Sequence, residues 1–336
     1  IRRPPRSTQG VSSAASDVYK RQILCISNSR ELIMKIGWIG VGNMGNPMAK
    51  SVQKFASEFT VCDLNQESAI DILEAGGNWA DTPAECAKDK DIVFMSLPMP
   101  QDVEKVCIGK SGIIETVNPS SIILDASTNS LAMVKKLHKL FEQKGIEFLD
   151  CPVSGGVIGA INRDMSIMVG GKESTYKKIK PALDSMGDKA IYCGPVGSGT
   201  ICKLSHQLFS ALLLGITTEV LASGVKAGMD LDTLVSAISK CASGKNPPFK
   251  NWIEAKEYNF ESNELSFFLE LAAKDVRLSC EMGRENKVPM DMSNILEQNL
   301  IEILNRGWGR KNSGILRKLI AEKAGIEFEY APGGFA

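Results

Sequence analysis

Two short segments of this chain combine residue types that could bind an anion such as a carboxylate. Asp125-Ala126-Ser127-Thr128 places two hydroxyl groups after an apolar run, and Ser154-Gly155-Gly156 joins a hydroxyl to two backbone amides without side chains. Adjacent backbone amides of this kind favour bound anions. Both segments also match ordinary turns or helix caps, and the local sequence leaves both interpretations open.

A third polar group lies near the start of a long apolar segment. Lys203 is followed by His206 and, one helical turn after the lysine, by Gln207. Burial lowers the pKa of a lysine, which suits it to donate or accept a proton. An isolated lysine of this kind is more often a surface residue that extends its ammonium group to solvent. We expect His206 to pack within its helix, with contact to a substrate as the alternative.

The segment 35–45, KIGWIGVGNMG, could hold a second reactant. It predicts a short strand that runs into G-x-G-x-x-G, the pattern that binds the pyrophosphate of a dinucleotide. Gly40 allows a tight turn, Gly42 lets phosphates approach the backbone, and Gly45 lets the next helix pack on the strand. That helix should begin near Asn43, with its amides toward the phosphates. The predicted cofactor contacts here are Gly40, Val41, Gly42, Asn43, Met44 and Gly45.

An acidic residue indicates which dinucleotide is preferred. Asp63 follows the apolar run 59–62 and lies 23 residues after Gly40. A carboxylate at about this spacing hydrogen-bonds the adenosine ribose, although Asp63 also fits an ordinary turn at a strand end. It would repel a 2′-phosphate, so the sequence predicts NAD as the cofactor, with NADP as the alternative.

Alternating strands and helices surround these groups. Continuous apolar runs, typical of parallel strands buried on both faces, are found at 91–97, 121–125, 147–149, 166–170 and 190–193. From residue 200 onward the spacing is helical, and 200–227 is apolar and free of proline. We therefore expect an α/β chain with a Rossmann doubly wound sheet over 34–196. A long inter-domain helix should lead into an all-α domain over 197–336.

The composition narrows the classes of partner. The 336 residues contain 39 Lys and Arg and 39 Asp and Glu, so no basic surplus indicates nucleic acid or a membrane surface. Charged and polar residues interrupt 200–227, which argues against a membrane span. Nine cysteines without a C-x-x-C pair predict reduced thiols in a cytoplasmic protein. With only two histidines, no metal site is expected.

Residues 1–33 differ from the rest of the chain. They are polar and basic, lack a sustained apolar period and contain no methionine, whereas Met34 directly precedes the glycine-rich segment. A transit peptide is one interpretation. We instead expect a non-native or disordered leader that plays no part in the fold.

From Met34 to about residue 325 the chain resembles the β-hydroxyacid dehydrogenase family, which includes 3-hydroxyisobutyrate dehydrogenase and 2-hydroxy-3-oxopropionate reductase. The order and spacing of six motifs carry the resemblance: GWIGVGNMGNPMA at the glycine-rich loop, SLP at 96–98, DAST at 125–128, DCPVSGGVIGA at 150–160, GSGTICK at 197–203 and LAAKDVRL at 271–278. The family fold, a Rossmann domain followed by a helical domain that dimerises, agrees with the organisation expected from the residues.

The resemblance implies an NAD(P)-dependent oxidoreductase that interconverts a small β-hydroxy acid and its semialdehyde. It also implies a homodimer or homotetramer, with Lys203 as the catalytic general acid or base. The implied substrate-binding residues are Ser127, Ser154, Gly155, Gly156 and Gln207. The further implied cofactor contacts are Leu97, Pro98, Thr128 and Lys274.

One residue departs from the family pattern. Relatives usually have asparagine four residues after the lysine, where this chain has Gln207, which is one methylene longer. Two other functions stay open, an imine reductase-like enzyme and a non-catalytic dinucleotide-binding scaffold. Relatives of both kinds replace the lysine, so Lys203 favours the dehydrogenase.

Overall fold

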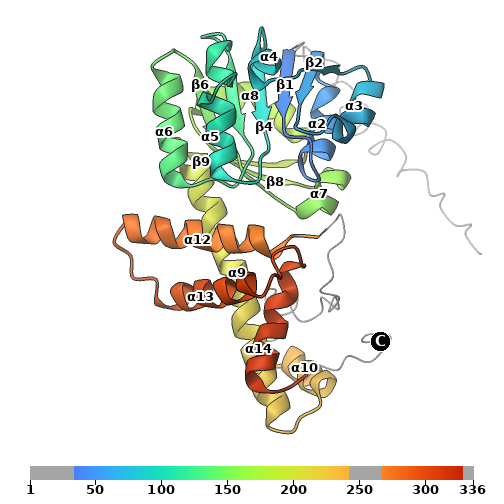
Figure 1. Cartoon of the computed structure of the whole chain (residues 1–336), viewed down its shortest axis with the longest axis vertical. Coiled ribbons are helices and arrows are strands. Elements are labelled where there is room, and N and C mark those ends of the chain that lie inside the picture. The colour runs from blue at the N-terminus through green and yellow to red at the C-terminus, as the bar shows by residue number, and fades with distance from the viewer. Residues whose placement is uncertain (1–33, 242–265, 328–336) are drawn as a thin grey trace, which may run out of the picture.

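The computed structural model describes residues 34–241 and 266–327. Figure 1 shows a sheet flanked by helices in one part of the molecule, a helical part beside it, and one long helix that passes from the first into the second. The expected leader at 1–33 lies outside the described residues, as do 242–265 and 328–336.

Nine strands form one sheet: β1 (Met34–Ile39), β2 (Ala56–Cys62), β3 (Asn78–Trp79), β4 (Ile92–Met95), β5 (Ile122–Asp125), β6 (Glu147–Asp150), β7 (Val153–Ser154), β8 (Ser166–Gly170) and β9 (Lys189–Gly194). Their order is β3-β2-β1-β4-β5-β6-β8-β7, with β9 paired to β8. Strands β1 to β6 pair in parallel, β8 runs antiparallel to β6, and β9 runs parallel to β8. The predicted doubly wound sheet is confirmed, with two reversed strands, β8 and β9, at one side.

The central strands are buried on both faces, as their continuous apolar runs predict. All residues of β4 and β5 are buried. Trp38 of β1 stacks on Phe94 of β4 with ring centroids 4.9 Å apart. The two faces of the sheet have separate cores, one around Trp38 and Met48 and the other around Phe141 and Phe148. Close packing on both sides makes the sheet a rigid support for the loops at its edge.

The helices that flank the sheet are α2 (Gly45–Gln53), α3 (Ile70–Glu74), α4 (Pro83–Ala87), α5 (Pro100–Ile108), α6 (Leu131–Glu142), α7 (Gly156–Asn162) and α8 (Glu173–Asp184). Helices α4 and α5 have no counterpart among the predicted elements. Each begins at a proline, whose fixed φ suits the first helical turn. The hydroxyl of Thr82 also caps α4 by accepting a hydrogen bond from the backbone N–H of Glu85 at 3.1 Å.

The helical part is organised around α9 (Ser198–Lys226), a single helix of 29 residues. Helices α10 (Leu231–Lys240), α12 (Leu269–Glu285), α13 (Asp291–Asn305) and α14 (Leu316–Ala324) lie against it (Figure 1). Apart from one isolated bridge between Phe268 and Asn312, the described residues after 197 contain no strand. The predicted long helix and the all-α second part are therefore confirmed.

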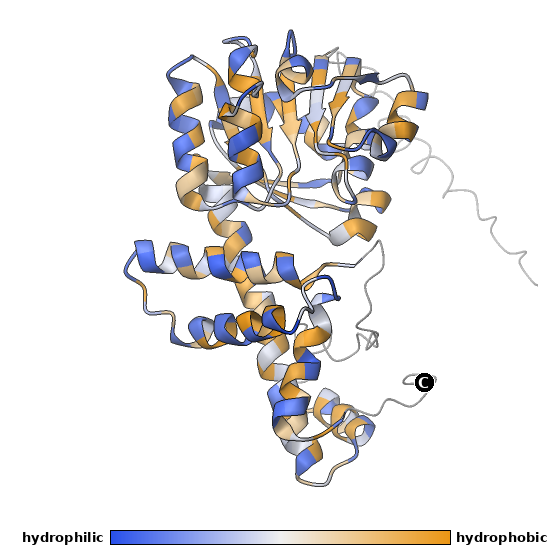
Figure 2. Ribbon diagram, viewed as in Figure 1, coloured by the Kyte–Doolittle hydropathy of each residue, from blue (hydrophilic) through white to orange (hydrophobic). Residues whose placement is uncertain are grey.

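Hydropathy differs between the helices of the two parts. Figure 2 shows that α6 alternates hydrophobic and hydrophilic residues, whereas α9 is hydrophobic over much of its length. The core of the helical part combines residues of α9, α12, α13 and α14, among them Leu214, Val276, Leu300 and Leu319. Other apolar residues of α9, such as Phe209, lie outside this core and are exposed.

Candidate active site

The glycine-rich loop between β1 and α2 has the backbone geometry expected of its glycines. Gly40 has a φ of +88°, and a Cβ on it would lie 2.3 Å from the carbonyl oxygen of Ser96. A Cβ on Gly45 would lie 1.9 Å from the carbonyl oxygen of Gly40, so α2 begins in direct contact with the strand backbone. A Cβ on Gly42 would meet nothing within 4 Å. The space beside Gly42 is open to a ligand, and the loop fits the pyrophosphate of a dinucleotide.

Asp63 follows β2 and lies against this loop. Its Oδ2 accepts a hydrogen bond from the backbone N–H of Val41 at 2.7 Å, and its Oδ1 accepts one from that of Asn65 at 3.1 Å. The carboxylate therefore holds the glycine-rich loop in place and retains lone pairs for a further donor. Its contact with an adenosine ribose stays a prediction.

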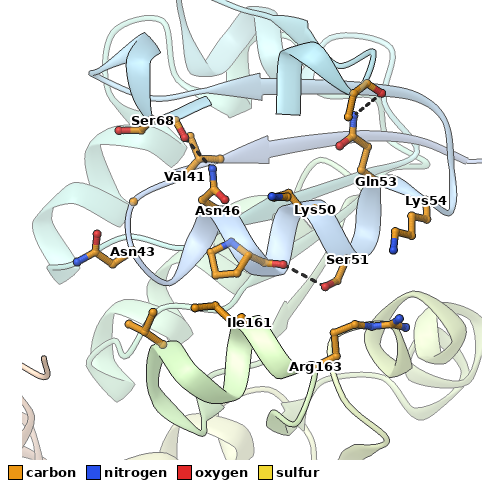
Figure 3. A pocket seen from close by; sticks show the side chains of 14 residues that line it. Val41, Asn43, Asn46, Lys50, Ser51, Gln53, Lys54, Ser68, Ile161 and Arg163 are labelled. Carbon is orange, nitrogen blue, oxygen red and sulfur yellow. Dashed lines mark hydrogen bonds between the residues drawn. The ribbon is translucent and has the colours of Figure 1, made fainter. Parts of the chain in front are cut away.

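A cavity of about 720 Å³ opens beside the glycine-rich loop and extends between α2 and α7 (Figure 3). Its lining begins at Val41, Gly42 and Asn43 and includes the side chains of Lys50, Lys54 and Arg163. Lys203 does not line this cavity. The open space on this side of the loop is therefore separate from the predicted proton donor.

The loops after β4 and β5 are joined through Ser127. Its Oγ accepts a hydrogen bond from the backbone N–H of Leu97 at 2.9 Å, and its own N–H donates to Oδ1 of Asp125 at 3.0 Å. Asp125 also accepts from the side-chain amide of Asn129 at 2.9 Å, and burial raises the pKa of its carboxyl to about 6. Ser127 therefore links the backbone after β4 to the buried carboxylate at the end of β5.

Lys203 lies in the second turn of α9 and is buried, with 6% of its surface exposed. Burial lowers the pKa of its ammonium group to about 8, while the charge of Asp275 opposes this shift and that of Lys274 adds to it. An amine with this pKa can exchange a proton near neutral pH. The alternative interpretation of Lys203 as a surface lysine is wrong.

Side chains of α12 connect Gln207, one turn after Lys203, to the loops of the sheet. Nε2 of Gln207 donates to Oδ2 of Asp275 at 2.5 Å, and Oδ1 of Asp275 lies 3.1 Å from Nζ of Lys274. Nζ of Lys274 in turn donates to the carbonyl oxygens of Thr128 at 2.9 Å and Pro98 at 3.2 Å. Lys274 thus reaches two of the predicted cofactor residues, although through their backbones.

Ser154 and His206 face each other across the start of α9. Oγ of Ser154 lies 3.2 Å from Nε2 of His206. His206 is exposed, so the expectation of a packed helix histidine is wrong. His206 is one turn past Lys203, and this spacing directs it to the strand that carries Ser154. Gly155 and Gly156 follow with φ values of +143° and +63°, which favour glycine.

Asp150, at the end of β6, holds the first turn of α9. Its Oδ1 accepts from the backbone N–H of Gly197 and its Oδ2 from that of Thr200, both at 2.7 Å. These bonds satisfy free amides at the helix N-terminus and fix the turn that precedes Lys203. Sequence reasoning missed the roles of Asp150 and Asp275. A signal for Asp150 was present, because the β5 and β6 runs both end in aspartate and parallel strands end at one edge.

Two family models together match nearly all the described residues. Residues 35–194 match the NAD-binding domain of 6-phosphogluconate dehydrogenase, and residues 197–319 match the NAD-binding region of NADP-dependent 3-hydroxyisobutyrate dehydrogenase. The two matches meet at the start of α9.

Full-length relatives agree with these matches. The mitochondrial 3-hydroxyisobutyrate dehydrogenase of Mus musculus is 30% identical over 302 residues, which cover 88% of this chain and 90% of the relative. The 2-(hydroxymethyl)glutarate dehydrogenase of Eubacterium barkeri is 31% identical over 299 residues, covering 88% and 98% of the two chains. The NAD-dependent L-serine dehydrogenase of Pseudomonas aeruginosa is 29% identical over 291 residues, covering 85% and 97%.

A solved structure shares the fold. The Mycobacterium tuberculosis 3-hydroxyisobutyrate dehydrogenase, solved with L-serine, superposes with a TM-score of 0.74 at 22% identity, covering 85% of this chain and 98% of that chain. The motif order, the family models and the relatives all lead to one assignment, and they confirm the expected reaction class and a cofactor that is NAD or NADP. The chain belongs to the β-hydroxyacid dehydrogenase family and is an NAD(P)-dependent oxidoreductase that acts on the hydroxyl group of a hydroxy acid.

Proposed function

We propose that this chain interconverts a short acid carrying a hydroxymethyl group and the corresponding semialdehyde, with Lys203 as the general acid or base. The buried Lys203, with its pKa lowered to about 8, is the observation that supports this role most directly. The named substrates of three relatives, 3-hydroxyisobutyrate, 2-(hydroxymethyl)glutarate and L-serine, all carry a hydroxymethyl group on the carbon next to a carboxylate. That shared unit defines the proposed substrate class.

Different residues bind the substrate carboxylate and transfer the proton. Ser127 and the turn Ser154-Gly155-Gly156 bind the substrate carboxylate, which fixes the position of the reacting carbon. A nicotinamide cofactor held by the glycine-rich loop would supply the hydride chemistry. Protonated Lys203 donates to the alkoxide that develops in reduction, and neutral Lys203 accepts the hydroxyl proton in oxidation.

Gln207 and Asp275 act through Lys203. The charge of Asp275 favours the protonated form of the lysine against the effect of burial. Gln207 holds one oxygen of Asp275 and Lys274 lies beside the other, so the carboxylate has a fixed position. A shorter asparagine would not span the same gap without movement of the helices. We therefore assign Gln207 a positioning role in addition to the predicted contact with substrate.

The cofactor preference rests on the carboxylate beside the glycine-rich loop. Asp63 follows β2 and is fixed by the backbone N–H groups of Val41 and Asn65. A fixed negative charge at this place repels the 2′-phosphate of NADP and leaves an acceptor for the 2′-hydroxyl of NAD. We propose that NAD is used in preference to NADP.

We also propose a cytoplasmic homodimer or homotetramer in which a second copy of the chain covers α9. Only 22% of the most apolar 18-residue stretch of α9 is buried, and Phe209, Ile216 and Val220 are 47–55% exposed. By length and composition α9 could also cross a membrane. Lys203 and Glu219 within it favour a protein partner over lipid. Light scattering should give at least a dimer, and co-flotation of a monomer with lipid vesicles would contradict this.

The reaction is tested by following absorbance of NADH and NADPH with a panel of semialdehyde acids, together with oxidation of their hydroxymethyl acids. We expect turnover of at least one acid with the hydroxymethyl unit, faster with NADH than with NADPH. A matched acid whose hydroxyl is on the carbon adjacent to the carboxylate should not react. Tight cofactor binding without turnover of any acid in the panel would contradict the proposal.

A further inference from the structure

Three of the eight described cysteines reach solvent. Cys193 is partly exposed and Cys202 and Cys241 are exposed, whereas the other five are buried. Exposure decides which thiols a dissolved reagent can reach. Cys202 directly precedes Lys203 in the chain, so chemistry at this thiol occurs on the turn of α9 that carries the lysine.

Cys193 and Cys202 belong to different elements that pack together. Gly194 of β9 contacts the first turn of α9, because a Cβ on Gly194 would lie 2.9 Å from Oγ of Ser198. Cys202 follows Ser198 by one helical turn and therefore lies on the same face of α9, toward β9. Cys193 is adjacent to Gly194, and the Cys202 thiol lies close enough to raise the pKa of the Cys193 thiol. Figure 1 shows α9 leaving the sheet next to β9.

The two thiols differ in reactivity. Burial raises the pKa of the Cys193 thiol to about 11, and the neighbouring Cys202 adds to that shift. Cys193 is therefore a poor first nucleophile at neutral pH. Cys202 is the more exposed of the two and is open to a reagent in solution. Such a pair resembles an attacking thiol with a resolving thiol beside it.

We propose that Cys193 and Cys202 form a modification site at which a small disulfide, such as oxidised glutathione, generates an intramolecular disulfide beside Lys203. The Cys202 thiolate attacks one sulfur of the small disulfide, the S–S bond breaks, and one small thiol leaves. The Cys193 thiolate then attacks the sulfur of Cys202 and releases the second small thiol. Two protein thiols are oxidised, and one small disulfide is reduced to two thiols.

The bridge acts on the turn that positions the proton donor. It would tie the first turns of α9 to β9 in a new geometry, next to the bonds that Asp150 makes with Gly197 and Thr200. Displacement of a catalytic group by about 1 Å can cost up to about a hundredfold in rate. We expect the bridged protein to show about tenfold lower turnover, restored by dithiothreitol. This effect on rate rests on the proposed role of Lys203, whereas formation of the bridge does not.

The test is treatment of the full chain with oxidised glutathione, followed by peptide mass analysis without reduction. The parent and Cys241→Ser should both lose two hydrogens and yield a peptide pair linked through Cys193 and Cys202. Cys193→Ser should stop at a glutathione adduct on Cys202, and Cys202→Ser should form no bridge. A persistent glutathione adduct on Cys202 in the parent, a bridge between two copies, or no reaction at Cys202 would overturn the proposal. A bridge that leaves turnover unchanged would overturn the effect on Lys203.

Discussion

The glycine-rich loop and the Lys203 cluster (Lys203, Gln207, Lys274 and Asp275) are built by contacts of different range. The loop is closed by the bond between Val41 and Asp63, 22 residues apart, and by contacts among its own glycines. The Lys203 cluster depends on bonds between residues much farther apart: Gln207 with Asp275 at 68 residues, and Lys274 with Thr128 and Pro98 at 146 and 176. Backbone shape defines the loop, and side-chain charge defines the Lys203 cluster.

This difference predicts different consequences of substitution. A change in the glycine-rich loop alters the space available to the backbone and to a ligand, so binding and stability should respond. A change in the Lys203 cluster alters the pKa of Lys203 or removes its amine, so the rate and its pH dependence should respond. A variant of the glycine-rich loop that left both cofactor binding and stability unchanged, or a Lys203 variant that left both rate and pH dependence unchanged, would contradict this division.

The largest effect is expected for Lys203→Met. Loss of a general acid or base should lower kcat by about 10³-fold, with cofactor binding retained. Stopped-flow or steady-state absorbance measures the rate, and nucleotide fluorescence measures binding. Lys226→Met, an exposed lysine at the far end of the same helix, is the matched control and should retain the parent rate. A Lys203→Met protein with near-parent turnover would rule out the proton-transfer role.

The same variant should be more stable than the parent at pH 7. Burial lowers the pKa of Lys203 from 10.5 to about 8, so below pH 8 the folded protein carries a costly buried ammonium group. This penalty is fully present below pH 8 and is relieved as pH rises from 8 to 10.5. Its removal should raise the free energy of unfolding by roughly 2–3 kcal/mol at pH 7. The gain measured by urea unfolding should shrink at pH 10.

In the glycine-rich loop, Gly42→Ala and Gly45→Ala form a matched pair. The first should weaken cofactor binding, and the second should lower stability. A methyl group on Gly42 meets open space, so Gly42→Ala should keep the melting temperature and raise the cofactor Kd about tenfold or more by blocking the approach of phosphates. A methyl group on Gly45 would overlap the carbonyl oxygen of Gly40, so Gly45→Ala should cost about 3 kcal/mol of stability. Calorimetry with and without NADH separates the two outcomes.

The range of contacts also explains how much the sequence could predict. Gly40, Gly42, Gly45 and Asp63 follow a local pattern whose geometry is the same wherever it occurs, so both the loop and the strand–helix alternation were predictable. The pairing of Gln207 with Asp275 was not, because no local pattern states which helices of the second part lie side by side. The antiparallel direction of β8 could not be predicted either, because an apolar run does not indicate the direction of its strand.

A smaller effect is expected for Lys274→Met, which breaks the link between α12 and the loops after β4 and β5. Two carbonyl oxygens, of Pro98 and Thr128, would lose a charged donor. We expect about tenfold weaker cofactor binding, since hydrogen bonds to charged groups contribute about 1.5–3 kcal/mol. Arg277→Met, on the same helix and paired with Glu281, is the control and should bind the cofactor as the parent does.

The smallest effect is expected for Asp275→Asn and Gln207→Asn. The pH dependence of kcat/KM should change in these variants, without a large loss of rate at the optimum pH. Reduction requires protonated Lys203, so kcat/KM for reduction should fall above about pH 8, and that for oxidation should rise toward the same pH. Asp275→Asn removes the charge that favours the protonated lysine and should move this apparent pKa below 8. Gln207→Asn should move it in the same direction by less. Unchanged profiles would show that Asp275 does not act through Lys203.

The length of α9 means that a small rotation at one end would cause a large displacement at the other. At 1.5 Å per residue its 29 residues span about 43 Å, and its pivot is the turn that Asp150 holds at the sheet. A tilt of about 5° at that pivot would displace the far end by about 4 Å, because a rigid rod magnifies a small rotation in proportion to its length. Such a tilt would move α10, which lies at the opposite extremity of the molecule (Figure 1).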